Sequence, residues 1–192
     1  MSVTILGEEY PIATTTILYL SELKKSNKKL KKMPELIGSL SNLKELYLKY
    51  NNLTSLPESI GMLSKLKDLY LSNNKLTYLP ESIGMLSNLE YLYLYNNNLT
   101  SLPESIQSLS NLKELYLENN NLTSLPESIK TFTKIEKLRL DETSYEINNL
   151  SMDCHTLVLT SIKNNITNLP PILRTPYLKH CVNVDMIKLP YG

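Results

Sequence analysis

The stretch "LYLYNNNLTSLPESI" at residues 92–106 returns at residues 115–129 as "LYLENNNLTSLPESI", a shift of 23 positions. The same shift connects a column of apolar residues along the chain, which are Leu43, Leu66, Leu89, Leu112 and Ile135. A fixed period of this length indicates one supersecondary unit copied along the chain. Because such a unit buries little surface by itself, neighbouring copies must stack to form a core.

Each copy carries the pattern L-x-x-L-x-L-x-x-N-x-L. Leu46 and Leu48 are two positions apart, so they share one face of a short strand while Tyr47 points to the other face. Strands of neighbouring copies then form a parallel sheet with a continuous leucine face. We expect the recurring asparagine to satisfy backbone groups where the chain leaves the strand, because a carboxamide offers both a donor and an acceptor. This asparagine ladder comprises Asn51, Asn74, Asn97 and Asn120.

The second half of the unit begins with Leu-Pro-Glu, at residues 56–58, 79–81, 102–104 and 125–127. Proline suits the first turn of a short helical segment, and glutamate just after it faces the positive end of the backbone dipoles. Ile60 and Leu63 should then point back at the core. A strand on one side and a bulkier helical turn on the other predict a curved arc.

Residues 30–140 resemble leucine-rich-repeat proteins, and the half-unit "LPESIGMLSNL" at residues 79–89 is similar to the 23-residue class of intracellular Ras-binding and scribble-type scaffolds. The resemblance implies an α/β solenoid, with a parallel sheet on the concave face and short helical or 3-10 turns on the convex face. It also implies a scaffold, adaptor or interference role.

The ends of the chain depart from the pattern, and we expect one domain, 1–192, in three parts. Residues 1–16 alternate around Gly7-Glu8 and predict a β-hairpin that caps the first hydrophobic layer. Residues 17–140 form the regular repeats, although Lys28 stands where the first asparagine belongs. Residues 141–192 form irregular repeats and a closure, because Thr143 replaces the next asparagine and the Leu-Pro signal recurs at shortened intervals.

Composition narrows the classes of function. The 192 residues carry a net charge of +1, so no global field would attract nucleic acid or an anionic membrane. The chain shows neither a signal peptide nor an apolar run of the roughly 20 residues that a membrane span needs. Two cysteines give no disulfide framework, so we expect a cytoplasmic protein. Five Asn-X-Ser/Thr sequons occur, at Asn52, Asn98, Asn121, Asn149 and Asn165, and since most are copies of one NNLT unit they indicate duplication rather than glycosylation.

The residues between the strand leucines should project from the concave surface. One column reads Tyr47, Tyr70, Tyr93 and Tyr116 and ends in Arg139, while Tyr50, Tyr91 and Tyr95 lie beside it. Tyrosine is enriched in binding hot spots because it offers a large rigid surface with a polar tip. These eight residues are our candidate partner-binding face. The competing interpretation is a packing feature, since tyrosine favours strands and neighbouring rings stabilise one another.

No catalytic or metal site is predicted. Cys154-His155 and His180-Cys181 have the residue types of a zinc site, but adjacent residues of a strand point to opposite faces and would not converge. Gly-rich phosphate loops, G-x-S-x-G and H-E-x-x-H are all missing from the sequence. We therefore expect a protein that is not an enzyme and uses no cofactor.

The sequence thus predicts protein recognition through the tyrosine-rich concave face, by a chain that is monomeric or only weakly self-associating. The alternative is a structural protein, such as a particle component, that self-assembles through the edges of its repeats. The residue usage, rich in Asn, Lys, Leu and Tyr and without Trp, would suit an AT-rich genome such as that of a giant virus or a pathogen.

Overall fold

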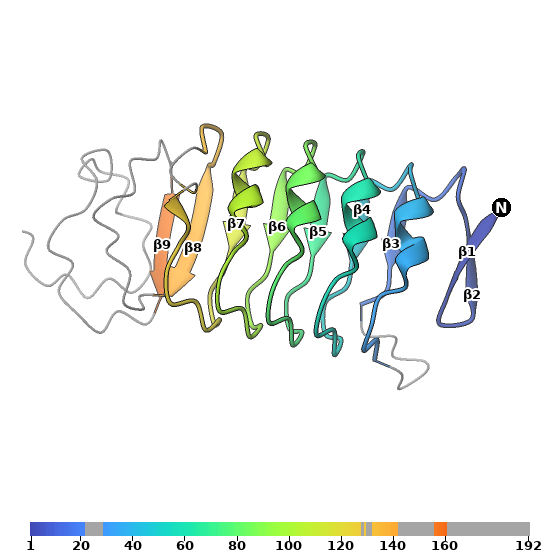
Figure 1. Ribbon diagram of the computed structural model, residues 1–192, viewed down its shortest axis with the longest axis horizontal. Helices are drawn as coiled ribbons and strands as arrows, with labels where there is room; N and C mark the ends of the chain where they lie inside the picture. Colours follow the sequence, from blue (N-terminus) through green and yellow to red (C-terminus); the bar gives the residue numbers. More distant parts are fainter. Residues whose placement is uncertain (22–28, 128, 130–131, 142–155, 161–192) are drawn as a thin grey trace, which may run out of the picture.

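The protein is a stacked solenoid. The computed structural model describes residues 1–21, 29–127, 129 and 132–141, and the backbone of residues 156–160. One parallel sheet runs in chain order from β3 to β9, and short 3-10 turns line its other side (Figure 1). The α/β solenoid expected from the repeat is confirmed.

The strands are short because the copies from β3 to β7 each supply only three residues to the sheet. They are β3 (Ile17–Tyr19), β4 (Glu45–Tyr47), β5 (Asp68–Tyr70), β6 (Tyr91–Tyr93), β7 (Glu114–Tyr116), β8 (Lys137–Asp141) and β9 (Thr156–Thr160). From β4 to β8 each residue pairs with the residue 23 positions later, as Leu46 does with Leu69. The sequence period therefore sets the strand register directly.

The register differs at both ends of the sheet. Leu18 pairs with Leu46, so the step from β3 to β4 is 28 residues. The second half of the unit keeps the step of 23, since the Leu30 amide donates to Asn51 Oδ1 as the Leu53 amide does to Asn74 Oδ1. Lys28, which the sequence analysis placed in the asparagine column, lies outside the described residues. Leu138 pairs with Leu157, a step of 19, so the next unit after β8 is shorter than the others.

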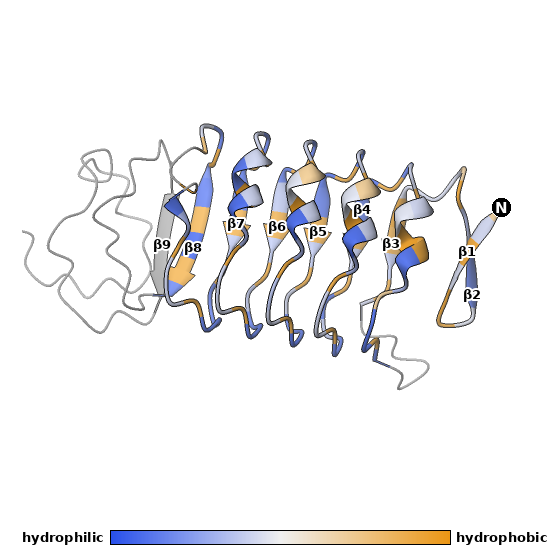
Figure 2. Cartoon of the chain, in the orientation of Figure 1, coloured by the Kyte–Doolittle hydropathy of each residue, from blue (hydrophilic) through white to orange (hydrophobic). Residues whose placement is uncertain are grey.

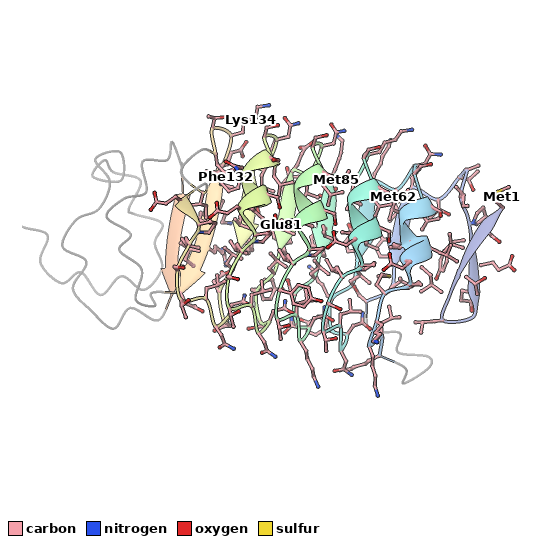
Figure 3. All side chains as sticks on the ribbon, viewed as in Figure 1. Met1, Met62, Glu81, Met85, Phe132 and Lys134 are labelled. Atoms are coloured by element: carbon pink, nitrogen blue, oxygen red, sulfur yellow. The ribbon has the colours of Figure 1, made fainter. Side chains whose placement is uncertain are left out.

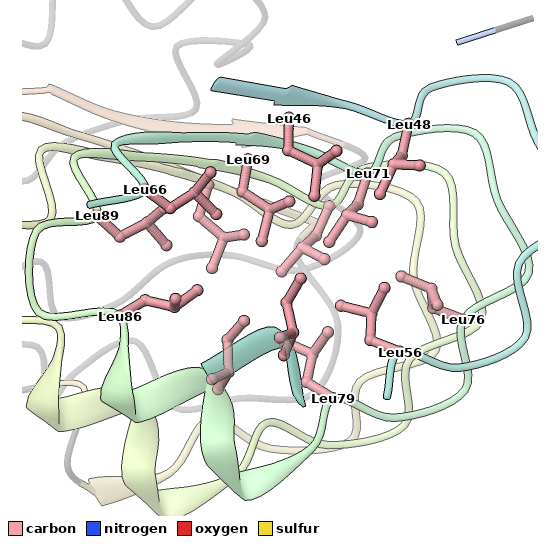
Figure 4. Close-up of a cluster of buried hydrophobic side chains, with 14 of the residues drawn as sticks. Leu46, Leu48, Leu56, Leu66, Leu69, Leu71, Leu76, Leu79, Leu86 and Leu89 are labelled. Atoms are coloured by element: carbon pink, nitrogen blue, oxygen red, sulfur yellow. The ribbon is translucent and has the colours of Figure 1, made fainter. Parts of the chain in front are cut away.

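The core lies between the sheet and the turns. Leu46, Leu69 and their equivalents on the strands face Leu56, Leu79 and Leu86 from the second half of each unit (Figure 4). The strand leucines of β4 to β8 are completely buried, and each such side chain contributes about 1.5 to 3 kcal/mol relative to exposure. Figure 2 shows the same hydrophobic positions recurring from unit to unit, with hydrophilic loops along the lower edge of the view.

The turns on the convex side are 3-10 helices: η1 (Glu35–Ser39), η2 (Glu58–Met62), η3 (Glu81–Met85) and η4 (Glu104–Ser108). Each follows a proline in extended conformation. A Cβ atom on Gly61 would lie 2.6 Å from the Ser82 carbonyl oxygen, so glycine lets neighbouring turns approach closely. Met62 and Met85 are exposed on this side, near Glu81 (Figure 3).

The glutamates that begin the turns connect each unit to the next. Glu58 Oε2 accepts a hydrogen bond from the Ser82 amide, and Glu81 Oε2 accepts one from the Ser105 amide, both at 3.3 Å. The donor is therefore not the turn that carries the glutamate but the amino end of the following turn. Anionic oxygens are favoured there by the exposed amides.

The asparagine of each unit holds two strands and one loop together. Asn97 Nδ2 donates to the carbonyls of Leu94 (2.9 Å) and Leu71 (3.0 Å), and its Oδ1 accepts from the amide of Leu76 (3.0 Å). Asn74 makes the equivalent bonds within and to the preceding unit. All donors and acceptors of the carboxamide thus serve buried backbone groups.

The N-terminal hairpin is confirmed, but its turn is not where the sequence placed it. β1 (Ser2–Ile5) pairs antiparallel with β2 (Glu8–Pro11) in a separate sheet. The turn residues are Leu6 and Gly7, with φ of 55° and 88°, rather than Gly7 and Glu8. Two successive positive φ angles match the twist of a two-residue hairpin. Val3 and Ile5 are buried in the core, so the hairpin covers the first leucine layer.

We predict that Asn97→Ala lowers the free energy of unfolding by about 2 to 4 kcal/mol, because it leaves buried backbone groups without partners. Chemical denaturation measures this. Asn98→Ala is the matched control, since Asn98 is exposed and should change stability by less than about 0.5 kcal/mol. Equal effects at both positions would contradict the role assigned to the ladder.

Candidate functional site

A continuous stack of aromatic rings runs along the concave face. Successive ring centroids are 4.5, 4.5, 5.0 and 4.4 Å apart. The stack consists of Tyr19, Tyr47, Tyr70, Tyr93 and Tyr116, and Arg139 continues the column. The sequence analysis missed Tyr19, which is 63% exposed at the end of the stack. Its signal was the triplet Leu18-Tyr19-Leu20, identical to residues 46–48 but hidden by the 28-residue step.

Hydrogen bonds to carboxylates hold two rings of this stack in place. The Tyr47 and Tyr93 hydroxyls donate to Glu45 Oε2 and Glu114 Oε2, each at 2.7 Å. The bond to Glu45 and burial raise the pKa of Tyr47, and burial followed by the bond to Glu114 raises that of Tyr93. Both hydroxyls therefore keep their protons at any physiological pH.

Cations of the same face lie over the rings. Lys49 Nζ is 4.4 Å from the Tyr70 centroid and 5.7 Å from that of Tyr93, where the two rings tilt apart by 56°. The Arg139 guanidinium lies 4.6 Å from the centroid of Tyr116. Such cation–π contacts are worth about 0.5 to 2 kcal/mol, and they show that the ring faces accept positive charge.

The tyrosines beside the stack differ from the stacked rings in their contacts. Tyr91 precedes Tyr93 on β6, and Tyr95 follows the strand by two residues, so three tyrosines cross the centre of the concave face. Within the residues that the structure describes, Tyr91 and Tyr95 make no ring contact and their hydroxyls make no hydrogen bond. The predicted face therefore divides into a stack with internal partners and central tyrosines without them.

Tyr50 is also separate from the stack. It is 47% exposed and has φ of 61°, whereas the equivalent residues with positive φ are Asn73, Asn96 and Asn119. Asparagine tolerates this left-handed conformation, and a bulky aromatic residue is strained in it.

Ion pairs at the strand starts compensate one another. Glu90 lies between Lys67, at 3.1 Å, and Lys113, at 2.6 Å. The hydrogen bonds from Lys113 and Lys67 lower the pKa of Glu90. Charges on neighbouring strands therefore attract one another at these three residues.

A second charged pair joins the buried Glu118 to the half-exposed Arg139 of β8. Glu118 Oε1 is 3.4 Å from Arg139 Nη1, while Glu118 Oε2 and Arg139 Nε are buried and find no hydrogen-bond partner among the described residues. Burial is the main cause that raises the pKa of Glu118, against the opposing effect of Arg139. An ionised carboxylate in this position is poorly compensated.

Neither a metal site nor a membrane span is found in the described part of the chain. No group of three or more His, Cys, Asp or Glu residues could hold a metal ion there. Cys154, His155, His180 and Cys181 lie outside these residues. Among the described helices, none is long and apolar enough to cross a bilayer.

We predict that Tyr50→Asn raises the free energy of unfolding by about 1 kcal/mol, because asparagine relieves the strain at positive φ. Chemical denaturation measures the change. Tyr78→Asn is the control, since Tyr78 is 55% exposed and has no positive φ. If the two substitutions gave the same change, strain at Tyr50 would be excluded.

Glu118 and Glu90 should respond to pH with opposite signs. Because the folded pKa of Glu118 is raised, its ionisation costs stability near neutral pH, and Glu118→Gln should raise the melting temperature at about pH 7. Because the folded pKa of Glu90 is lowered, Glu90→Gln should lower the melting temperature there. The Glu118 difference should shrink as the pH falls toward about 4, because its raised pKa lets the wild-type carboxyl become protonated. The Glu90 difference should persist to lower pH, because its folded pKa lies below the ordinary value. Melting curves over this pH range would show shifts of the same sign if the assignment were wrong.

Two family models and three solved structures that match this chain are all of leucine-rich-repeat proteins. A model described as leucine-rich repeat region matches residues 59–157, and a leucine rich repeat model matches residues 19–76. The Leptospira interrogans LRR protein LIC12759 is 40% identical with a TM-score of 0.66, over 77% of this chain and 38% of that one. No curated protein sequence matches the chain.

Two further structures come from other settings. The leucine-rich repeat domain of the type III effector XCV3220 (XopL) is 29% identical with a TM-score of 0.63, covering 76% of this chain and 53% of the other. The ectodomain of the Arabidopsis thaliana receptor kinase GASSHO1/SCHENGEN3, in complex with CASPARIAN STRIP INTEGRITY FACTOR 2, is 31% identical with a TM-score of 0.57, over 67% and 17% of the two chains. The chain spans between 17% and 53% of the length of these three proteins. The repeat period, the asparagine ladder, the parallel sheet and these matches together show that the chain belongs to the leucine-rich-repeat family.

Proposed function

We propose that this chain is a non-enzymatic interaction module that binds a protein partner on its concave face. The observation that carries the proposal is the central strand β6, where Tyr91 and Tyr95 flank the stack without internal hydrogen bonds or ring contacts in the described part of the chain. Side chains that do not stabilise their own fold in this way are available to a partner. Leucine-rich-repeat domains in general mediate protein–protein interaction, which agrees with this assignment.

The stack of tyrosines would serve as a rigid support for the contact. Rings held by stacking and by hydrogen bonds to Glu45 and Glu114 lose little entropy when a partner covers them. Tyrosine is also a frequent hot-spot residue. The proposed contact residues are Tyr47, Tyr50, Tyr70, Tyr91, Tyr93, Tyr95, Tyr116 and Arg139, with Tyr91 and Tyr95 as the principal anchors.

The similar structures support an adaptor, scaffold or host-interference role. One of them is a receptor ectodomain in complex with another factor, and another is a type III effector domain. The two cysteines in 192 residues fit action in the cytoplasm. We propose a monomer as the active form, because the concave face alone supplies the contact surface.

The test is an affinity capture from lysate of the source cell and of candidate hosts. The variant is Tyr91→Ser combined with Tyr95→Ser, which should leave the fold intact because neither side chain has an internal partner in the described residues. Tyr78→Ser, at an exposed tyrosine outside the concave columns, is the matched control. Circular dichroism and melting curves confirm folding of all three proteins.

We expect a protein that wild type and Tyr78→Ser capture and that the double variant loses by at least about tenfold, as truncation of two hot-spot side chains implies. A partner that all three proteins retain equally would move the interaction site away from the concave face. Light scattering of the purified proteins tests the proposed monomer. A molar mass that rises with concentration in both the wild type and the double variant would contradict it.

A further inference from the structure

Three carboxylates on the concave face form no ion pair with a cation of the described residues. Glu45, Asp68 and Glu114 occupy one column with Tyr91, so that Asp68, Tyr91 and Glu114 are partners in register on three adjacent strands. Glu45 and Glu114 accept hydroxyl hydrogen bonds from the tyrosine stack. No ion pair among the described residues reaches any of the three carboxylates, although Lys137 of β8 is the in-register neighbour of Glu114.

The cations of the face are engaged elsewhere. Lys67 and Lys113 are held by Glu90 at the strand starts, and Lys49 lies over the rings of Tyr70 and Tyr93. Lys44 is exposed beside Glu45 but forms no ion pair with it. Lys137, which follows Glu114 in the column, lies 5.3 Å from the centroid of Tyr116. From β4 to β7 the column therefore consists of three half-buried carboxylates and an unstacked tyrosine.

This arrangement costs the isolated protein stability. Glu45 and Asp68 lie directly opposite each other on neighbouring strands, and like charges in that relation repel. Burial, with the carboxylates of Glu45 and Glu90, raises the pKa of Asp68, and only Lys67 opposes the shift. A positive group delivered by a partner would remove this cost.

Geometry selects the kind of positive group. Asp68 and Glu114 are two strands apart, about 10 Å at the sheet spacing, with the ring of Tyr91 between their strands. A guanidinium is planar, stacks on aromatic rings and donates from both sides, whereas an ammonium is a compact point charge. Stacked rings of this face already hold the guanidinium of Arg139 over Tyr116.

We propose that the concave face recognises a partner segment that presents an arginine side chain, seated over Tyr91 between Asp68 and Glu114. The proposal rests on the proposed function and specifies the chemistry of the partner. Asp68 and Glu114 determine its charge preference, and Tyr91 supplies the stacking surface. Lysine in the same position binds more weakly, because it cannot donate to both carboxylates while lying flat on the ring.

The test selects peptides without knowledge of the natural partner. A random linear peptide library displayed on phage is panned on wild type, on Tyr91→Ser/Tyr95→Ser and on Asp68→Asn/Glu114→Gln. The last variant keeps the side-chain shapes, and a glutamine oxygen still accepts the Tyr93 hydroxyl. Glu35→Gln/Glu104→Gln removes two charges from exposed residues of the convex turns and is the control.

We expect peptides selected on wild type and on the control to be enriched in arginine and to require Tyr91 and Tyr95. A synthetic peptide from this set should bind Asp68→Asn/Glu114→Gln at least about tenfold more weakly, and replacing its arginine by lysine should weaken binding to wild type. Tyrosine-dependent peptides without arginine enrichment, or with equal affinity for the charge variant, would overturn the arginine assignment and leave the proposed function standing. If no selected peptide required the tyrosines, both proposals would fail.

Discussion

The rest of the structure depends on the hydrogen bonds that one asparagine of each unit makes to three backbone groups. Asn97 joins carbonyls at the ends of β5 and β6 to an amide in the loop of the preceding unit, which fixes both the spacing and the register of the two units. Once that register is fixed, leucines meet leucines across the sheet and tyrosines meet tyrosines. Both the core and the aromatic stack are thus consequences of identical units held at one spacing.

The side chains of the two faces of the solenoid therefore have different roles. On the convex side, glycines let the turns approach closely and glutamates bind the following turn, so the backbone there is occupied with packing. The concave side has a stable middle column and two outer columns whose residues change from unit to unit. Tyr91 stands where the two neighbouring strands carry Asp68 and Glu114, and Tyr95 where other units carry Lys49, Ser72 or Glu118. Variation within an otherwise exact repeat is what a recognition surface requires, because a uniform surface would distinguish partners poorly.

The sequence predicted most of the fold because a copied unit repeats its physical instructions. Leu46 and Leu69 pair because their positions in the unit are the same, and no long-range information was needed. The 23-residue period did not predict the 28-residue step from β3 to β4, because that unit is longer than the others. The hairpin turn was misplaced by one residue, because Leu6 adopts a positive φ that is uncommon for its residue type. The sequence column predicted which residues lie on the candidate site. It did not predict which tyrosines stack and which make no ring contact. That division depends on ring tilt and on which carboxylate each hydroxyl reaches, as Tyr93 does with Glu114.

The most direct measurement places a photo-crosslinking residue, p-benzoylphenylalanine, at Tyr95 on the concave face and, in a second protein, at exposed Met85 on the convex turns. Both proteins are irradiated in source-cell or host lysate, and crosslinked products are identified by mass spectrometry. The account predicts a specific covalent adduct with one protein from position 95 and none from position 85. Adducts formed from position 85 alone would contradict it and would place recognition on the convex side of the solenoid.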